Sequence, residues 1–190
     1  MSSISRNTLR ADSTSRRALG AGLALTLLSG TALAGGAHRF VFTAYSDAAG
    51  GVAVVNGRYR AALTELKDLT APVDLDPAAT NTNRCVAYSM TAQWQQARIA
   101  CDAAVRAADR QRTAIPDWLG WTPASSDERL ALAYANRAVM LWLSHDGAAA
   151  QRDLARAQEL APVATFVAQN AEALKMHGPV TLAAAPPPRS

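Results

Sequence analysis

Apolar residues recur at helical spacing along most of this chain, and this feature constrains its fold more than any other. Residues 59–69 place Tyr59, Leu63 and Leu66 on one face of a helix. Similar periodic segments cover residues 77–90, 94–112, 125–144, 148–160 and 163–176. Runs of β-branched residues, which favour strands, are rare. We therefore expect an all-α protein.

Capping and turn residues separate the periodic segments from one another. Asp76 is suited to an N-cap and is followed by Pro77, which is favoured at the first helical position. Residues 125–128 have the pattern of a capping box. Residues 56–57 and 146–147 are Asn-Gly and Asp-Gly pairs, which favour turns. The helices are therefore expected to follow one another in pairs.

Residues 1–34 have the composition of a signal peptide. Arginines are followed by a short apolar stretch, and Ala32 and Ala34 match the small-x-small cleavage pattern. We expect cleavage after Ala34 and a mature chain in the periplasm or outside the cell. An uncleaved membrane anchor is the alternative, although the apolar stretch is short. Residues 15–19 partly match a twin-arginine signal, so the export route stays open.

The positive charge of the chain is concentrated in this N-terminal segment. The whole chain has a formal net charge of +4, of which residues 1–34 contribute +3 through four arginines and one aspartate. The remaining residues are nearly neutral and lack the basic surface that nucleic-acid binding requires. After cleavage we expect neither nucleic-acid binding nor membrane insertion.

Two helix pairs share a pattern of aromatic, small and large residues. In the later pair it consists of Tyr134, Asn136, Ala138, Leu141, Ala150, Leu154, Ala157 and Pro162. In the earlier pair the matching positions are Cys85, Tyr88, Trp94, Ala97, Cys101 and Ala104. This pattern resembles the tetratricopeptide repeat.

The resemblance implies a short tetratricopeptide-like α-solenoid of about three helix pairs and a C-terminal capping helix. The units would cover about residues 44–70, 77–113 and 125–162, with a cap at 163–177 and an insertion at 114–124. Residues 35–43 would form an N-terminal arm, and the proline-rich residues 178–190 a disordered tail.

The resemblance also implies a concave surface lined by the first helix of each pair. The residues expected there are mostly apolar, namely Val86, Met90, Leu132, Val139, Trp142 and Leu143. We expect this groove to bind an apolar peptide or an amphipathic helix of a partner protein. Two other occupants stay open, because the arm at residues 38–42 could fill the groove and two copies could form a homodimer through it.

The best-known ligand site of the family is not implied for this chain. That site holds a C-terminal carboxylate with lysine, asparagine and arginine side chains. The matching positions here are Thr82, Val86, Ala135 and Val139, which cannot form such a clamp. The expected ligand is therefore not a carboxylate terminus.

Two tryptophans, Trp118 and Trp121, lie in the expected insertion. Exposed tryptophans are costly and are favoured at partner surfaces. This insertion loop therefore either binds a partner or folds back as a lid over the neighbouring helix pairs.

Cys85 and Cys101 form an even pair in an expected oxidising compartment, which favours a disulfide. In the tetratricopeptide helix pair these two positions face each other at nearly the same height. The resemblance thus implies a Cys85–Cys101 bond, with two buried free thiols as the alternative.

Motifs of common catalytic and metal sites are missing from the sequence. It contains no Cys-x-x-Cys, His-Glu-x-x-His, phosphate-binding glycine loop or Gly-x-Ser-x-Gly, and His38, His145 and His177 are scattered. We expect no enzyme activity, cofactor or metal, and favour a periplasmic adaptor or scaffold. A chaperone-like envelope assembly or stress factor is the main alternative, and a small enzyme using the arm and the insertion is a third.

Overall fold

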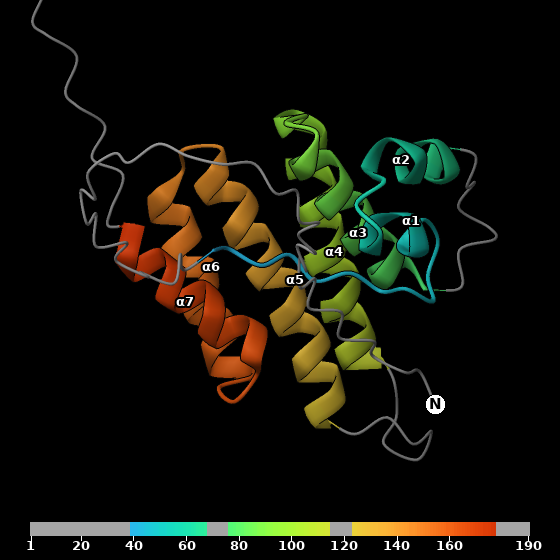
Figure 1. The fold of residues 1–190 in the computed structure, drawn as a ribbon. Helices are drawn as coiled ribbons and strands as arrows, with labels where there is room; N and C mark the ends of the chain where they lie inside the picture. The colour runs from blue at the N-terminus through green and yellow to red at the C-terminus, as the bar shows by residue number, and fades with distance from the viewer. Residues whose placement is uncertain (1–38, 68–75, 115–122, 178–190) are drawn as a thin grey trace, which may run out of the picture.

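The computed structural model describes residues 39–67, 76–114 and 123–177 of the chain. These residues form helices that pack against one another, and the described ranges contain no strand (Figure 1). The helices are α1 (Gly51–Val55), α2 (Tyr59–Lys67), α3 (Pro77–Met90), α4 (Trp94–Ala114), α5 (Pro123–Leu143), α6 (Gly147–Leu160) and α7 (Thr165–His177). The expected all-α class is confirmed. No helix in these ranges is both long enough and apolar enough to cross a membrane.

One type of turn joins α1 to α2, α3 to α4 and α5 to α6. At each turn one residue has a left-handed backbone: Gly57 (φ 72°), Ala92 (φ 56°) and His145 (φ 67°). The N–H of this residue donates to the carbonyl three residues earlier, and the next N–H donates to the carbonyl five residues earlier, at 2.8–3.1 Å. These bonds satisfy carbonyls at the helix end. The helix pairs therefore share one local geometry, although only the first has glycine at this position.

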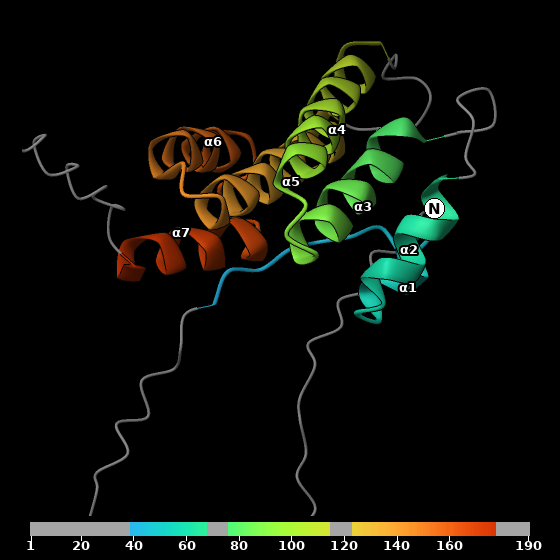
Figure 2. The same cartoon turned by 90° about the horizontal axis from the view of Figure 1, so that it is seen from above.

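The odd-numbered helices lie side by side. Contacts join α1 to α3, α3 to α5 and α5 to α7, so these helices form a continuous layer, which we call the odd-helix layer (Figure 2). The helices α2, α4 and α6 each pack against the helix that precedes them. Each of these turns thus folds an even-numbered helix back against the odd-numbered helix before it.

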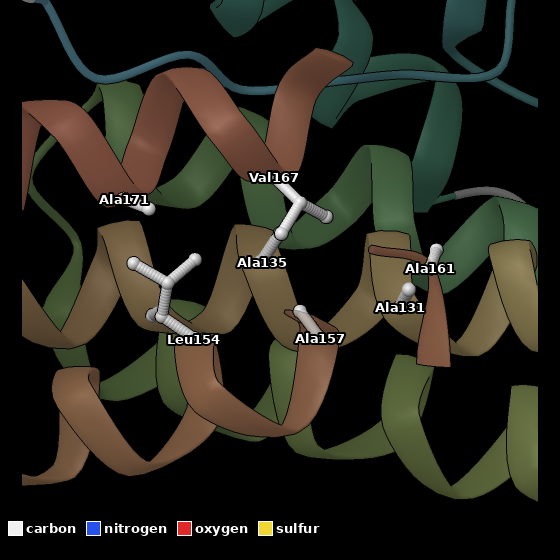
Figure 3. Packing of buried hydrophobic residues seen from close by; sticks show 8 residues of the cluster. Ala131, Ala135, Leu154, Ala157, Ala161, Val167 and Ala171 are labelled. Atoms are coloured by element: carbon white, nitrogen blue, oxygen red, sulfur yellow. The ribbon is translucent and has the colours of Figure 1, made fainter. Parts of the chain in front are cut away.

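Small side chains allow the helices to approach closely. In the cluster formed by α5, α6 and α7, Leu154 and Val167 are surrounded mainly by alanines (Figure 3). The alanines of this cluster are Ala131, Ala135, Ala138, Ala157, Ala161 and Ala171. Such small residues bring helix axes together, while the larger side chains fill the space between them.

The start of the helical region differs from the sequence-based expectation. Helical signals were expected from Ala44, but α1 begins only at Gly51. Gly50 has a φ of 68°, and a Cβ at Gly51 would lie 1.9 Å from the carbonyl oxygen of Tyr45. This close approach ends the extended segment before α1 in a tight turn, so the first helix pair is short.

The start of α5 also differs slightly, because it begins at Pro123 rather than at the expected capping box of residues 125–128. Proline is well suited to the first helical position, where its missing N–H has no intrahelical acceptor. The predicted signal peptide, residues 35–38 of the arm and the C-terminal tail lie outside the described residues.

Candidate functional site

An extended arm crosses the odd-helix layer. From here on the arm means residues 39–45, which extend two residues beyond the expected end at residue 43 and run past α7, α5 and α3 before the turn into α1 (Figures 1 and 2). It passes from one end of the layer to the other without secondary structure of its own. Its main chain therefore has to find hydrogen-bond partners on the helices.

Three asparagines, one from each of these helices, bind alternate residues of the arm, and we call them the asparagine ladder. Asn170 of α7 binds Val41, Asn136 of α5 binds Thr43, and Asn83 of α3 binds Tyr45. Each amide oxygen accepts the N–H of its arm residue and each amide nitrogen donates to the carbonyl of the same residue.

The bonds of the ladder have good geometry. The N–H bonds measure 2.7 Å at Val41, 3.0 Å at Thr43 and 2.9 Å at Tyr45. The carbonyl bonds measure 3.0, 2.7 and 2.9 Å in the same order. These are ordinary lengths for amide hydrogen bonds. Because both the N–H and the carbonyl of these three residues are bound, the ladder recognises main chain rather than side chains.

The asparagines themselves are almost fully buried. Asn83 is 0% exposed, and Asn136 and Asn170 are each 1% exposed. Burying an amide without hydrogen bonds is costly, and the arm supplies the partners of all three. Without a bound chain, the amide oxygen and the amide nitrogen of each of the three asparagines would lose these hydrogen bonds. The site is therefore built to hold an extended polypeptide.

Side chains at the even-numbered positions of the arm attach it to the helices. The ring of Phe40 lies 5.6 Å from that of Trp142 and stacks on that of His177 at 5.5 Å. Phe42 packs against two core clusters, one around the cysteines and one around α1 and α2, and Ala44 packs against the second. Apolar side chains at every second position thus complement the ladder.

A charged network fixes the other end of the arm. The guanidinium of Arg129 lies 4.8 Å above the ring of Tyr45 and binds Asp76 at 2.6 Å. Asp76 also accepts the N–H of Ala79 at 3.1 Å and so caps α3, which confirms the expected N-cap. Burial is the main cause that raises the pKa of Tyr45 to about 12, so its hydroxyl stays protonated.

The pKa of Asp76 is set by opposing effects. Burial acts to raise it, but hydrogen bonds from Gln111 and the Ala79 N–H and the charge of Arg129 lower the pKa below its ordinary value. Asp76 is therefore ionised at neutral pH and links the first turn of α3 to α5.

The expected groove residues have different positions relative to the arm. Trp142 contacts Phe40, and Val86 belongs to the cluster against which Phe42 packs. Leu132 and Val139 are buried. Met90 is 45% exposed and Leu143 is 38% exposed. The arm, one of the occupants considered from the sequence, therefore meets this surface at Trp142 and near Val86.

Neither Trp118 nor Trp121 lies within the described residues, so the two interpretations of the insertion loop remain predictions. The disulfide is present: Cys85 of α3 and Cys101 of α4 are bonded, with their Cα atoms 4.7 Å apart. It lies in a core cluster with Met140 and Leu141 and connects the two helices of the second pair.

Sequence reasoning missed the function of the three asparagines. Asn83 and Asn136 directly follow Thr82 and Ala135, which were considered only as positions of a carboxylate clamp. A signal was present, because 34 residues separate Asn136 from Asn170, and Asn83 and Asn136 each lie nine residues before a left-handed turn residue. The alternation of apolar residues in the arm was a second signal.

Within the described ranges, no group of three or more His, Cys, Asp or Glu side chains has an arrangement that could hold a metal ion. Neither a scan against protein-family models nor searches of curated proteins and of solved structures found a match. A function for this chain is therefore inferred from the geometry of the arm and the asparagine ladder.

Proposed function

We propose that this protein is an exported, tetratricopeptide-like interaction module that binds extended polypeptide on its odd-helix layer. The asparagine ladder is the observation that carries this proposal, because it binds both main-chain groups of Val41, Thr43 and Tyr45. The protein would act as an adaptor or scaffold in the periplasm or outside the cell, without enzymatic activity.

The repeat interpretation is supported by three regularities of the structure. The interval of 34 residues from Asn136 to Asn170 matches the usual repeat length of about 34 residues. The same turn recurs at Gly57, Ala92 and His145, and each first helix contacts the next first helix. We therefore retain a short solenoid of about three helix pairs with α7 as its cap.

The geometry favours an extended ligand over a helical one. A helix uses its own N–H and carbonyl groups internally, so it cannot satisfy the ladder. An extended chain presents both groups of every second residue to one edge. The contacts of Phe40 and Phe42 further favour a ligand with apolar or aromatic residues at alternate positions.

Recognition of main chain also supports a chaperone-like function as the second candidate. A ladder that does not read side chains tolerates many sequences, as binding of unfolded clients requires. The two functions differ in selectivity, because an adaptor should prefer one partner sequence and a chaperone should bind many extended apolar peptides with similar affinity.

The proposal is tested with a labelled peptide that copies residues 39–45. The receiving protein is the Thr43→Pro variant, in which the arm lacks the N–H that Asn136 accepts and should be released from the layer. We expect the peptide to bind this variant more tightly than the unaltered protein, as measured by fluorescence anisotropy. Adding Asn136→Ala to the variant should weaken binding by about tenfold.

Two methylated peptides serve as a matched pair. Methylating the peptide nitrogen at the copy of Thr43 removes an N–H that the ladder binds, whereas methylation at the copy of Phe42 removes one that it does not bind. Binding should be lost in the first case and retained in the second. Equal binding of both peptides, or binding insensitive to Asn136→Ala, would show that the ladder does not hold the ligand.

A further inference from the structure

Only one edge of the arm is used by the helices. The ladder binds the main-chain groups of Val41, Thr43 and Tyr45. Within the described part of the chain, the N–H and carbonyl groups of Phe40, Phe42 and Ala44 have no hydrogen-bond partner. In an extended chain these two sets of groups point in opposite directions. The unpaired set is therefore directed away from the asparagines.

The side chains of the arm extend to the two flanks rather than over this unpaired edge. Phe40 points toward Trp142 and His177, which lie in the last turns of α5 and α7. Tyr45 lies under Arg129, which is in the second turn of α5. One edge of the arm thus faces the odd-helix layer, and the opposite edge faces away from it. We call the edge that faces away, formed by the main chain of Phe40, Phe42 and Ala44, the outer edge.

We propose that the arm stays in place and that its outer edge accepts a strand from a partner polypeptide. An edge with free N–H and carbonyl groups at every second residue can pair with another extended chain, as in strand addition to a sheet. Here the arm acts as the template, and the asparagine ladder holds it straight. The inference rests on the proposed function in one respect, that the ligand is an extended polypeptide, and it places this ligand on the arm instead of on the asparagine ladder.

Exposed apolar side chains beside the arm define the chemistry of that partner. His177 lies two helical turns after Asn170 and contacts Phe40. Leu143 likewise lies two helical turns after Asn136, and Met90 lies two turns after Asn83. Helix geometry therefore places both side chains on the same flank of the arm as His177. They are 38% and 45% exposed. A strand on the outer edge should therefore carry apolar residues at alternate positions facing this flank.

Hydrogen exchange of individual amides, measured by NMR on the mature protein, tests the proposal. The probe is a short synthetic peptide of alternating valine and threonine with terminal lysines for solubility. Without the probe, the amides of Val41, Thr43 and Tyr45 should exchange slowly and those of Phe42 and Ala44 rapidly. With the probe, the amides of Phe42 and Ala44 should slow by at least about tenfold, while the ladder-bound amides stay protected.

Three outcomes would overturn the proposal. Loss of protection at Val41, Thr43 and Tyr45 would show that the ligand displaces the arm, which leaves the proposed function intact. Slowing at Phe42 and Ala44 that grows with protein concentration, without probe, would assign the outer edge to a second copy. Absence of probe binding at millimolar concentration would show that the edge accepts no strand of this kind.

Two exposed aliphatic residues, Leu143 and Ile99, provide a matched pair of variants. Leu143→Ser should weaken probe binding by about fivefold, because it removes apolar surface from the flank that faces the added strand. Ile99→Ser changes a more exposed apolar residue on α4, which is 63% exposed and belongs to a different layer, and should leave binding unchanged. Equal effects of the two substitutions would exclude the proposed flank.

Discussion

At the scale of single residues, the turns of the second and third helix pairs contain avoidable strain. Ala92 and His145 are exposed and have left-handed backbones, which L-residues with a Cβ adopt at a cost of about 1 kcal/mol. We expect Ala92→Gly and His145→Gly each to raise the free energy of unfolding by about 0.5 to 1 kcal/mol. Urea unfolding followed by circular dichroism measures this change.

Gly57 provides the control for this prediction. A Cβ at Gly57 would meet no atom within 4 Å, so Gly57→Ala introduces left-handed strain without a clash. It should lower the free energy of unfolding by about 1 kcal/mol. If Gly57→Ala is neutral, the strain argument for the other two turns is wrong as well.

The ion pair of Asp76 and Arg129 should make stability depend on acid pH. Asp76→Asn keeps an N-cap side chain but removes the charge that pairs with Arg129. We expect the variant to be less stable by about 2 kcal/mol at pH 7. The folded pKa of Asp76 is below the ordinary 3.8, so this contribution is full above that pH and is lost as the pH falls through the folded pKa.

Thermal unfolding of both proteins between neutral pH and about pH 2 checks the prediction. The difference in melting temperature should stay constant down to about pH 4 and then shrink. A difference that stays constant over the whole range would show that the charge of Asp76 does not contribute.

At the scale of secondary-structure elements, the disulfide should stabilise the pair formed by α3 and α4. Cys85 and Cys101 are separated by 16 positions, a loop length for which cross-linking contributes about 3 kcal/mol. The double variant Cys85→Ala, Cys101→Ala should lose about this amount in urea unfolding. A reducing agent should bring the unaltered protein to a similar stability, and insensitivity to reduction would contradict the bond.

Elements with strong local signals were predictable from the sequence. The N-cap Asp76 and Pro77 placed the start of α3 correctly, and the periodicity from Trp94 placed α4. The start of α1 was not predictable, because it depends on the contact between Gly51 and the carbonyl of Tyr45, which involves the bound arm. Local propensity cannot reveal a boundary that is set by tertiary contact.

At the scale of the whole molecule, the arm adds a connection between two core clusters that Tyr88 of α3 also joins. Phe42 packs against the cluster of Cys85 and Cys101 and also against the cluster of α1 and α2. Phe42→Ala should therefore lower the free energy of unfolding by about 2 kcal/mol, which is less than for a fully buried phenylalanine. Ile99→Ala, at an exposed site on α4, should change it by less than about 0.5 kcal/mol.

The width of the calorimetric unfolding transition shows whether Phe42→Ala breaks a connection between the clusters or only removes buried apolar area. If the arm connects the clusters, Phe42→Ala should also broaden the unfolding transition or split it, because α1 and α2 would unfold before the remaining helices. A transition that shifts but stays equally sharp would contradict a connecting function of the arm.

The candidate site was only partly predictable from sequence. Trp142 was expected on the binding surface and contacts the arm there. The ladder was not expected, because an asparagine inside a helix has no distinctive local signal and becomes a ligand only when packing brings three of them into line. The site depends on the spacing between helices. The interval from Asn136 to Asn170 reflects that spacing, but the sequence does not indicate that the two asparagines bind the arm.

The order of the ladder along the chain has a consequence for biosynthesis. Tyr45, Thr43 and Val41 are 38, 93 and 129 residues from their asparagines. The N-terminal residues are made first, but each successive contact needs a longer part of the chain, and the last needs α7. Closing a longer loop costs little extra entropy once the previous contact has formed. The arm should therefore fasten stepwise from Tyr45 to Val41, and only a chain translated through α7 completes it.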